Sequence, residues 1–314
     1  MRPDPKTLAG IVFSLCLIVV SSASGAYALE RAPVLNDSEI GVLVLAHGAG
    51  PEWNKAVKDT VLGVSGGYKK VIVFGMGDAA GIQRGIDKLE GTGVKAIVVV
   101  PLFLSSHSEM YRNLEYVLGL REEPDVLFWM LMTGGEEEGH AEHQMSVTKQ
   151  VKFFVPYAVA SAIDYEPFVA AILVERAAEA TRGTKDASVF LLAHGPISAE
   201  DNKLWLGDLN SYTAVLSARF PGAKFFAHTF RDDAPPFIKE PAVRNIQDAI
   251  KKEKESGREV VVVPYLLAPG GREDEIKRIT ENCGCALYPK TLLPHPNLSW
   301  WIEREIQAAL SRLR

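Results

Sequence analysis

The chain has 314 residues, with 34 lysines and arginines against 39 aspartates and glutamates, so its formal net charge at pH 7 is −5. This acidic balance is not that of a protein whose main partner is nucleic acid. The length exceeds what one hydrophobic core usually serves and suits two domains of ordinary size.

The N-terminus has the layout of a secretory signal peptide. Two basic residues precede an apolar run at 8–20, and small residues follow up to an Ala-Tyr-Ala sequence that ends at Ala28. Cleavage there removes two basic residues and one acidic residue, which leaves a net charge of −6 on an exported, periplasmic protein. An uncleaved membrane anchor is the alternative, although about 13 apolar residues fall short of the ~20 that span a bilayer.

Short apolar runs alternate with helical patterns between residues 38 and 182. Strands are predicted near 41–46, 70–75, 96–101 and 152–156, and helices near 53–64, 79–91, 108–119 and 166–182. Strands that alternate with helices of this length predict βαβ units, a parallel sheet and right-handed crossovers. We therefore expect an N-terminal lobe of the α/β class.

Residues 120–150 form an insertion in this lobe, with no counterpart later in the chain. The insertion contains His140 and His143 among several glutamates and glycines. An insertion of this length usually signals a functional loop or a disordered one. Two interpretations stay open: a solvated acidic loop, or a flap whose histidines and carboxylates capture a divalent cation.

The second half, residues 186–314, repeats the order of the first. Strands are predicted near 188–193, 223–228, 259–264 and 285–288, and helices near 202–219, 238–256, 271–281 and 297–313. The run that ends in Ala46-His47-Gly48 recurs as the run that ends in Ala193-His194-Gly195. The chain is thus predicted to contain two similar lobes related by an internal repeat, each a parallel sheet flanked by helices.

Only two cysteines, Cys283 and Cys285, remain after cleavage of the signal peptide. In the oxidising compartment that export implies, they could close a small strained disulfide or hold a soft metal. They could equally be two small buried residues.

Two histidines and a carboxylate follow strands of the first half. His47 ends the first strand, before a glycine-rich turn that lets another molecule approach the backbone, and His107 and Glu109 follow the apolar run at 97–104. Parallel strands bring their carboxyl ends to one edge of a sheet, so these side chains form a candidate site for a borderline divalent metal. Imidazole could also take protons from a substrate near neutral pH. Alternatively, His47 is structural and Glu109 belongs to a capping box that begins at Ser106.

These motifs, in this order, resemble the sirohydrochlorin cobaltochelatase family, which belongs to the class II tetrapyrrole chelatases. The resemblance covers roughly residues 38–313. It rests on the strand-His-Gly start, the run Val98-Val-Val-Pro-Leu-Phe-Leu104 with a following histidine, Ile163-Asp-Tyr-Glu-Pro167, Arg231-Asp-Asp-Ala-Pro235 and Leu293-Pro-His-Pro296. It implies two flavodoxin-like lobes that face each other across a cleft. It also implies ATP-independent insertion of a divalent metal, commonly Co²⁺ and otherwise Ni²⁺ or Fe²⁺, into a tetrapyrrole such as sirohydrochlorin.

The resemblance further implies roles for single residues. The family's first ligand histidine matches His47, and its second ligand falls on either His107 or Glu109. The corresponding turn of the second half reads Gly270-Gly271-Arg272, so we expect one metal site rather than two. Arg231 and Arg272 could face carboxylates of the substrate. His194 is expected to be either a remnant of the repeat or a contact to the substrate.

A different function class stays open beside the enzyme. An exported protein with these lobes and histidines could bind and deliver a metal or a tetrapyrrole without turnover. We expect a monomer or a homodimer in either case.

Overall fold

The computed structural model describes residues 35–75, 78–127, 149–182, 184, 186–281 and 283–313. The predicted signal peptide and the two histidines of the insertion, His140 and His143, lie outside the described residues, so export, anchoring and the cation-binding flap stay predictions. Among the described residues, no helix is both long enough and apolar enough to cross a membrane.

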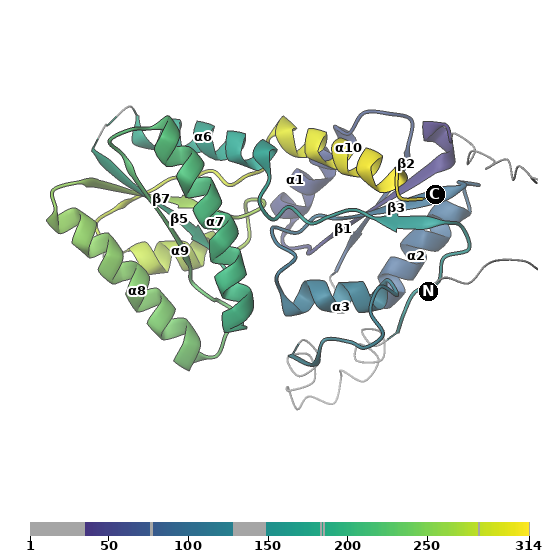
Figure 1. Ribbon diagram of the computed structural model, residues 1–314, viewed down its shortest axis with the longest axis horizontal. Coiled ribbons are helices and arrows are strands. Elements are labelled where there is room, and N and C mark those ends of the chain that lie inside the picture. Colours follow the sequence, from purple (N-terminus) through teal and green to yellow (C-terminus); the bar gives the residue numbers. More distant parts are fainter. Residues whose placement is uncertain are drawn as a thin grey trace, which may run out of the picture. The chain divides into compact units, whose positions relative to one another are not determined.

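The first half forms a four-stranded parallel sheet (Figure 1). Its strands, in spatial order, are β2 (Lys69–Phe74), β1 (Ile40–Ala46), β3 (Ala96–Pro101) and β4 (Tyr157–Val159), and its helices are α1 (Pro51–Leu62), α2 (Ala79–Glu90) and α3 (Glu109–Val117). A short 3-10 turn, Asp37–Glu39, precedes β1. Every residue of β1 and β3 is buried, because helices cover both faces and apolar side chains that point either way can leave water.

The second half repeats this sheet. Its strands, in spatial order, are β6 (Lys224–Thr229), β5 (Ala187–Ala193), β7 (Glu259–Pro264) and β8 (Ala286–Leu287), and its own helices are α7 (Ala199–Arg219), α8 (Pro236–Glu255) and α9 (Glu273–Thr280). All pairings are again parallel. The predicted fold class, two similar parallel α/β sheets related by a repeat, is therefore confirmed.

The last helix of each half packs against the sheet of the other half. Helix α6 (Pro167–Thr181) contacts β5, β7 and α7, whereas α10 (Pro296–Leu310) contacts β3, β4 and α1 (Figure 1). One apolar cluster accordingly contains Val42 of β1, Val189 of β5 and Trp301 of α10. Each half therefore gives its final helix to the packing of the other half, and the predicted bounds of 38–182 and 186–314 stay predictions.

One predicted strand, at 152–156, is wrong in position, since the strand extends only from Tyr157 to Val159. The backbone amides of Lys152 and Phe154 donate instead to the side chains of Gln83 and Glu90 on α2. An amide engaged in this way cannot pair with a neighbouring strand. The other predicted strands begin and end within one residue of the observed bounds, and the helices within three.

Cys283 and Cys285 are free thiols beside the end of α9. Their sulfur atoms lie 3.5 Å from the carbonyl oxygen of Ile279 and 3.9 Å from that of Thr280. Burial raises the pKa of both thiols, that of Cys285 to about 11. Of the three interpretations of this pair, the structure shows the half-buried thiols.

Candidate active site

A cavity of about 170 Å³ lies at the carboxyl ends of β1, β3, β5 and β7. In each sheet the second strand in the chain lies on one side of the first strand, and the third strand lies on its other side. The strand orders β2-β1-β3-β4 and β6-β5-β7-β8 show this reversal. Open α/β sheets bind ligands at such a switch point. The polar residues and tryptophans that line the cavity include His47, Trp53, Glu109, His194, Trp205 and Arg272.

The two repeated histidines share one local geometry. The Nδ1 atom of His47 lies 2.6 Å from the carbonyl oxygen of Gly48, and that of His194 lies 3.1 Å from the carbonyl oxygen of Gly195. A carbonyl oxygen can only accept, so Nδ1 carries the proton and the lone pair of Nε2 is free. Both glycines have φ in the left-handed region, +82° and +73°, where a side chain would be strained.

Glu109 brings a carboxylate to the same cavity. It is the first residue of α3, and only 7% of its surface is exposed. Its Oε2 atom is buried and has no hydrogen-bond partner among the described residues. Burial raises the pKa of this carboxyl, and the negative charge of Asp201 adds to the effect. A buried carboxylate oxygen without a partner is costly, which is typical of a group kept for binding or catalysis.

The capping-box interpretation of Glu109 is wrong. The cap of α3 is Ser108, whose hydroxyl oxygen accepts from the amide of Tyr111. The amide of Ser106, which a capping box would pair with Glu109, donates to Asp164 at 2.6 Å instead. Glu109 therefore takes no part in a capping box at this helix end.

We expect the variant Glu109→Gln to be more stable than the wild type at pH 7 and to lose activity. Because the pKa of Glu109 is raised in the folded state, the native protein is destabilised relative to the unfolded chain once the pH exceeds the ordinary carboxyl pKa of about 4.5. The gain from the amide should therefore be absent below about pH 4.5, grow between this pH and the raised pKa, and stay constant above it. Thermal unfolding of both proteins between pH 4 and 8 measures the difference, and a gain that is equal at every pH would contradict this account.

The imidazole ring of His107 lies outside the cavity. Its Nε2 atom is 3.6 Å from Oδ2 of Asp208 on α7, and it is not among the residues that line the cavity. The structure thus brings together His47 and Glu109 of the three predicted ligands. It adds His194, which lines the same cavity.

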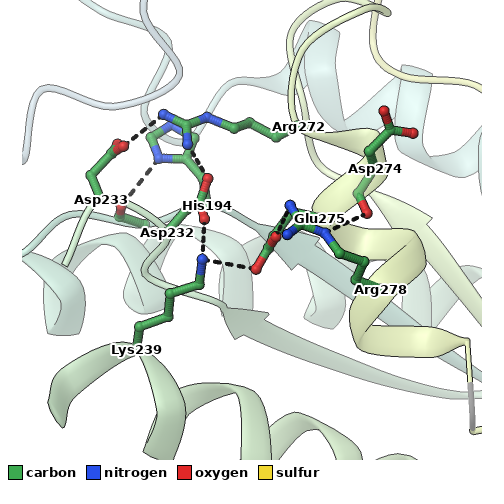
Figure 2. A network of polar contacts seen from close by, with 9 residues as sticks. His194, Asp232, Asp233, Lys239, Arg272, Asp274, Glu275 and Arg278 are labelled. Carbon is green, nitrogen blue, oxygen red and sulfur yellow. Dashed lines mark hydrogen bonds and ion pairs between the residues drawn. The ribbon is translucent and has the colours of Figure 1, made fainter. Parts of the chain in front are cut away.

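Arg272 lines the cavity but already has anionic partners. Figure 2 shows the network around it, whose ion pairs join Asp233, Arg272, Asp232, Lys239 and Glu275. The distance from Nη2 of Arg272 to Oδ1 of Asp233 is 2.7 Å. A substrate carboxylate that reaches this guanidinium must therefore compete with two aspartates.

His194 is kept neutral by its surroundings. Burial lowers the pKa of its imidazole, more strongly than the nearby Asp233 raises it, and Arg272 lowers it further. A neutral imidazole with a free Nε2 is the form that binds a metal ion. The second copy of the repeat therefore keeps the chemistry of a ligand.

Arg231 supports the loop that carries His194. Its guanidinium donates to the carbonyl oxygens of Pro196, at 3.2 Å, and Ile197. Arg231 is not one of the cavity's lining residues. Its guanidinium thus contacts the segment after His194 and not the cavity.

Residues 41–180 match the model of the CbiX family. The chain therefore contains a CbiX domain. This domain includes His47 and Glu109, and the match confirms the resemblance to the class II tetrapyrrole chelatases that the motifs indicated.

Two solved structures resemble the CbiX domain together with the second half of the chain. SirB from Bacillus subtilis with Fe³⁺ has 17% sequence identity and a TM-score of 0.57, and the match covers 86% of this chain and 95% of SirB. The sirohydrochlorin chelatase SirB from Bacillus subtilis subspecies spizizenii in complex with cobalt has 16% identity and a TM-score of 0.53, over 87% and 96%. Likeness at these identities establishes the fold. No curated protein matches the chain in sequence.

Proposed function

We propose that the protein inserts a divalent metal ion, in the first place Co²⁺, into a tetrapyrrole such as sirohydrochlorin without ATP. The observation that carries the proposal is the meeting, in one cavity, of two imidazoles and a buried carboxylate oxygen, where neither Nε2 atom nor this oxygen has a hydrogen-bond partner among the described residues. The CbiX domain and the likeness to SirB structures that hold cobalt or Fe³⁺ support it. The metal is a substrate here, so it needs ligands that hold it and then release it.

The pKa shifts suggest how these residues divide the work. A divalent metal that enters the macrocycle replaces two pyrrole N–H protons, which must be accepted by some base. The raised pKa of Glu109 favours proton uptake, whereas the lowered pKa of His194 favours the neutral, metal-binding imidazole. His47 is exposed and can exchange its proton with solvent after each transfer. Metal delivery and proton removal thus fall to neighbouring side chains.

The lining of the cavity suits the apolar faces of a macrocycle, but the volume of the cavity is small for one. Apolar side chains form much of the lining, among them Trp53, Leu102, Phe103, Leu104, Leu266 and Leu267. The cavity's volume of about 170 Å³ is below the ~300–1,000 Å³ of most small-molecule sites. We therefore expect the segments after β3 and β7 to move apart when a tetrapyrrole binds.

A metal-insertion assay with the chain from Leu29 onward tests the proposal. Sirohydrochlorin is mixed anaerobically with Co²⁺, Ni²⁺ or Fe²⁺ in separate reactions, and the change of the macrocycle's visible spectrum is followed with and without protein. We expect the protein to accelerate formation of the metallated product over many turnovers, with Co²⁺ the preferred ion. A spectral change that saturates at one equivalent of protein would instead identify a binding or delivery protein.

A further inference from the structure

A second group of candidate metal ligands lies outside the cavity. His107, Asp164 and Asp208 each offer one ligand atom, and these three atoms lie within 4.8 Å of one another. In the described part of the chain this is the one such group of three or more side chains. None of the three residues lines the cavity of His47.

The three side chains come from three separate segments. His107 follows β3, Asp164 precedes α6, and Asp208 lies on α7. The indole Nε1 of Trp205 donates to the carbonyl oxygen of His107 at 2.7 Å, and the hydroxyl of Tyr212 donates to that of Asp164 at 2.8 Å. Residues 205, 208 and 212 are spaced three and four apart and so share one face of α7. This face holds the backbone of both loops in place beside Asp208.

Asp164 is also oriented through its carboxylate. The amide and the hydroxyl of Ser106 donate to its two oxygens, at 2.6 and 2.9 Å. Each carboxylate oxygen has a second lone pair that these bonds leave free. Hydrogen bonds of this kind orient the ligands of metal sites.

The distance between His107 and Asp208 fits a coordination shell better than a hydrogen bond. The 3.6 Å between Nε2 and Oδ2 exceeds the ~3.2 Å limit of a good N–H···O bond. In a tetrahedral shell with bonds of about 2.0–2.1 Å, neighbouring ligand atoms lie about 3.3–3.4 Å apart. Small side-chain rotations would close this difference.

The buried oxygen of Asp208 points to a missing partner. Its Oδ2 atom is buried and makes no hydrogen bond with any described residue, although the side chain as a whole is 26% exposed. Burial and the nearby Asp164 raise the pKa of this carboxyl, against the lowering effect of His107. Two carboxylates carry a charge of −2, which a divalent cation balances.

We propose that His107, Asp164 and Asp208 bind a divalent ion of the Zn²⁺, Co²⁺ or Ni²⁺ class, through one nitrogen and two oxygens. Borderline ions accept this mixed ligand set, and a fourth position stays open to water. Because Asp208 belongs to the second half and the other two ligands to the first, the ion ties the two halves together. The proposal does not depend on insertion activity, since it concerns a site outside the cavity.

Zn²⁺ binding to the mature chain tests this site. We compare the wild type with Asp208→Asn, which keeps the size of the side chain but removes the charge, and with Asp59→Asn, a matched change at an exposed position on α1. Equilibrium dialysis gives the number of bound ions, and thermal unfolding with and without Zn²⁺ gives the stabilisation. The wild type and Asp59→Asn should show the same high-affinity binding and the same rise in Tm. In Asp208→Asn, one equivalent should weaken more than ~100-fold, beyond the loss typical of an outer-shell change, and the rise in Tm should shrink.

Two further variants keep the outcome decisive. Asp164→Asn replaces Asp208→Asn if the latter does not fold, because asparagine tolerates the φ of +45° at this position. His47→Ala should retain the equivalent that Asp208→Asn loses, which separates this site from the cavity. Equal Zn²⁺ binding and equal Tm shifts in the wild type and the aspartate variants would overturn the proposal, whatever the result of the insertion assay.

Discussion

Replacing His47 with alanine is expected to lower the rate of metal insertion by about 10²- to 10⁴-fold, the usual contribution of a positioned acid or base. The change removes a free Nε2 from the cavity and leaves His194 and Glu109 in place. Initial rates with sirohydrochlorin and Co²⁺ measure the loss. The side chain of His47 is exposed, so the free energy of unfolding should change by no more than ~0.5 kcal/mol.

Two companion variants separate His107 from Glu109 as the second ligand of the reaction. Glu109 lines the cavity and His107 does not, so Glu109→Gln should lose more activity than His107→Ala. The reverse order would assign the reaction to His107. Wild-type rates in His47→Ala would remove the central claim of the proposed function.

Truncation of Trp301 on α10 to alanine is expected to lower the free energy of unfolding by about 3–5 kcal/mol, as for other buried aromatic residues. Its side chain is 1% exposed and belongs to the apolar cluster that contains Val42 and Val98 of the first sheet. The loss comes from the apolar contacts and from the cavity that remains. Urea unfolding followed by circular dichroism measures it.

The neighbouring tryptophan provides the control. Trp300 is 51% exposed on the same helix, where its ring contacts Phe168 with the centroids 6.4 Å apart. Trp300→Ala should therefore lower the free energy of unfolding much less than Trp301→Ala. Both variants replace tryptophan with alanine on the same helix, so the change in helix propensity is the same. Similar losses for both variants would show that α10 does not bury Trp301 against the first sheet.

The strands were predictable where a continuous apolar run is buried on both faces of its sheet. β1 and β5 are continuous apolar runs buried on both faces, so their bounds and their terminal histidines follow from the sequence. The absence of a strand near 152–156 was not predictable. Backbone amides of this segment donate to Gln83 and Glu90, which lie more than 60 residues away in the chain. The exchange of α6 and α10 was equally hidden, since an apolar helix face indicates burial but not which sheet it covers.

The site was predictable to the extent that it follows single strands. His47 and Glu109 were predicted as candidates from their place after β1 and β3, and both line the cavity, but the meeting of His47 with His194 depends on two sheet edges that lie against that cavity. The sequence signal was the repeat itself, which delivers two histidines with the same turn. Asp164 lies in a recognised motif without a metal role, and Asp208 carries no signal at all, because a single aspartate on a helix is most often a solvated side chain.

The exchanged helices set the order in which the protein can complete its folding during synthesis. Domains usually fold from the N-terminus as they leave the ribosome. Here β1 is made early, whereas α10 (residues 296–310), which packs on the first sheet, is made only after both sheets. The nascent first sheet therefore lacks part of its apolar cover until these residues have been made. A premature stop after residue 295 would leave every strand intact and still deprive the first sheet of this cover.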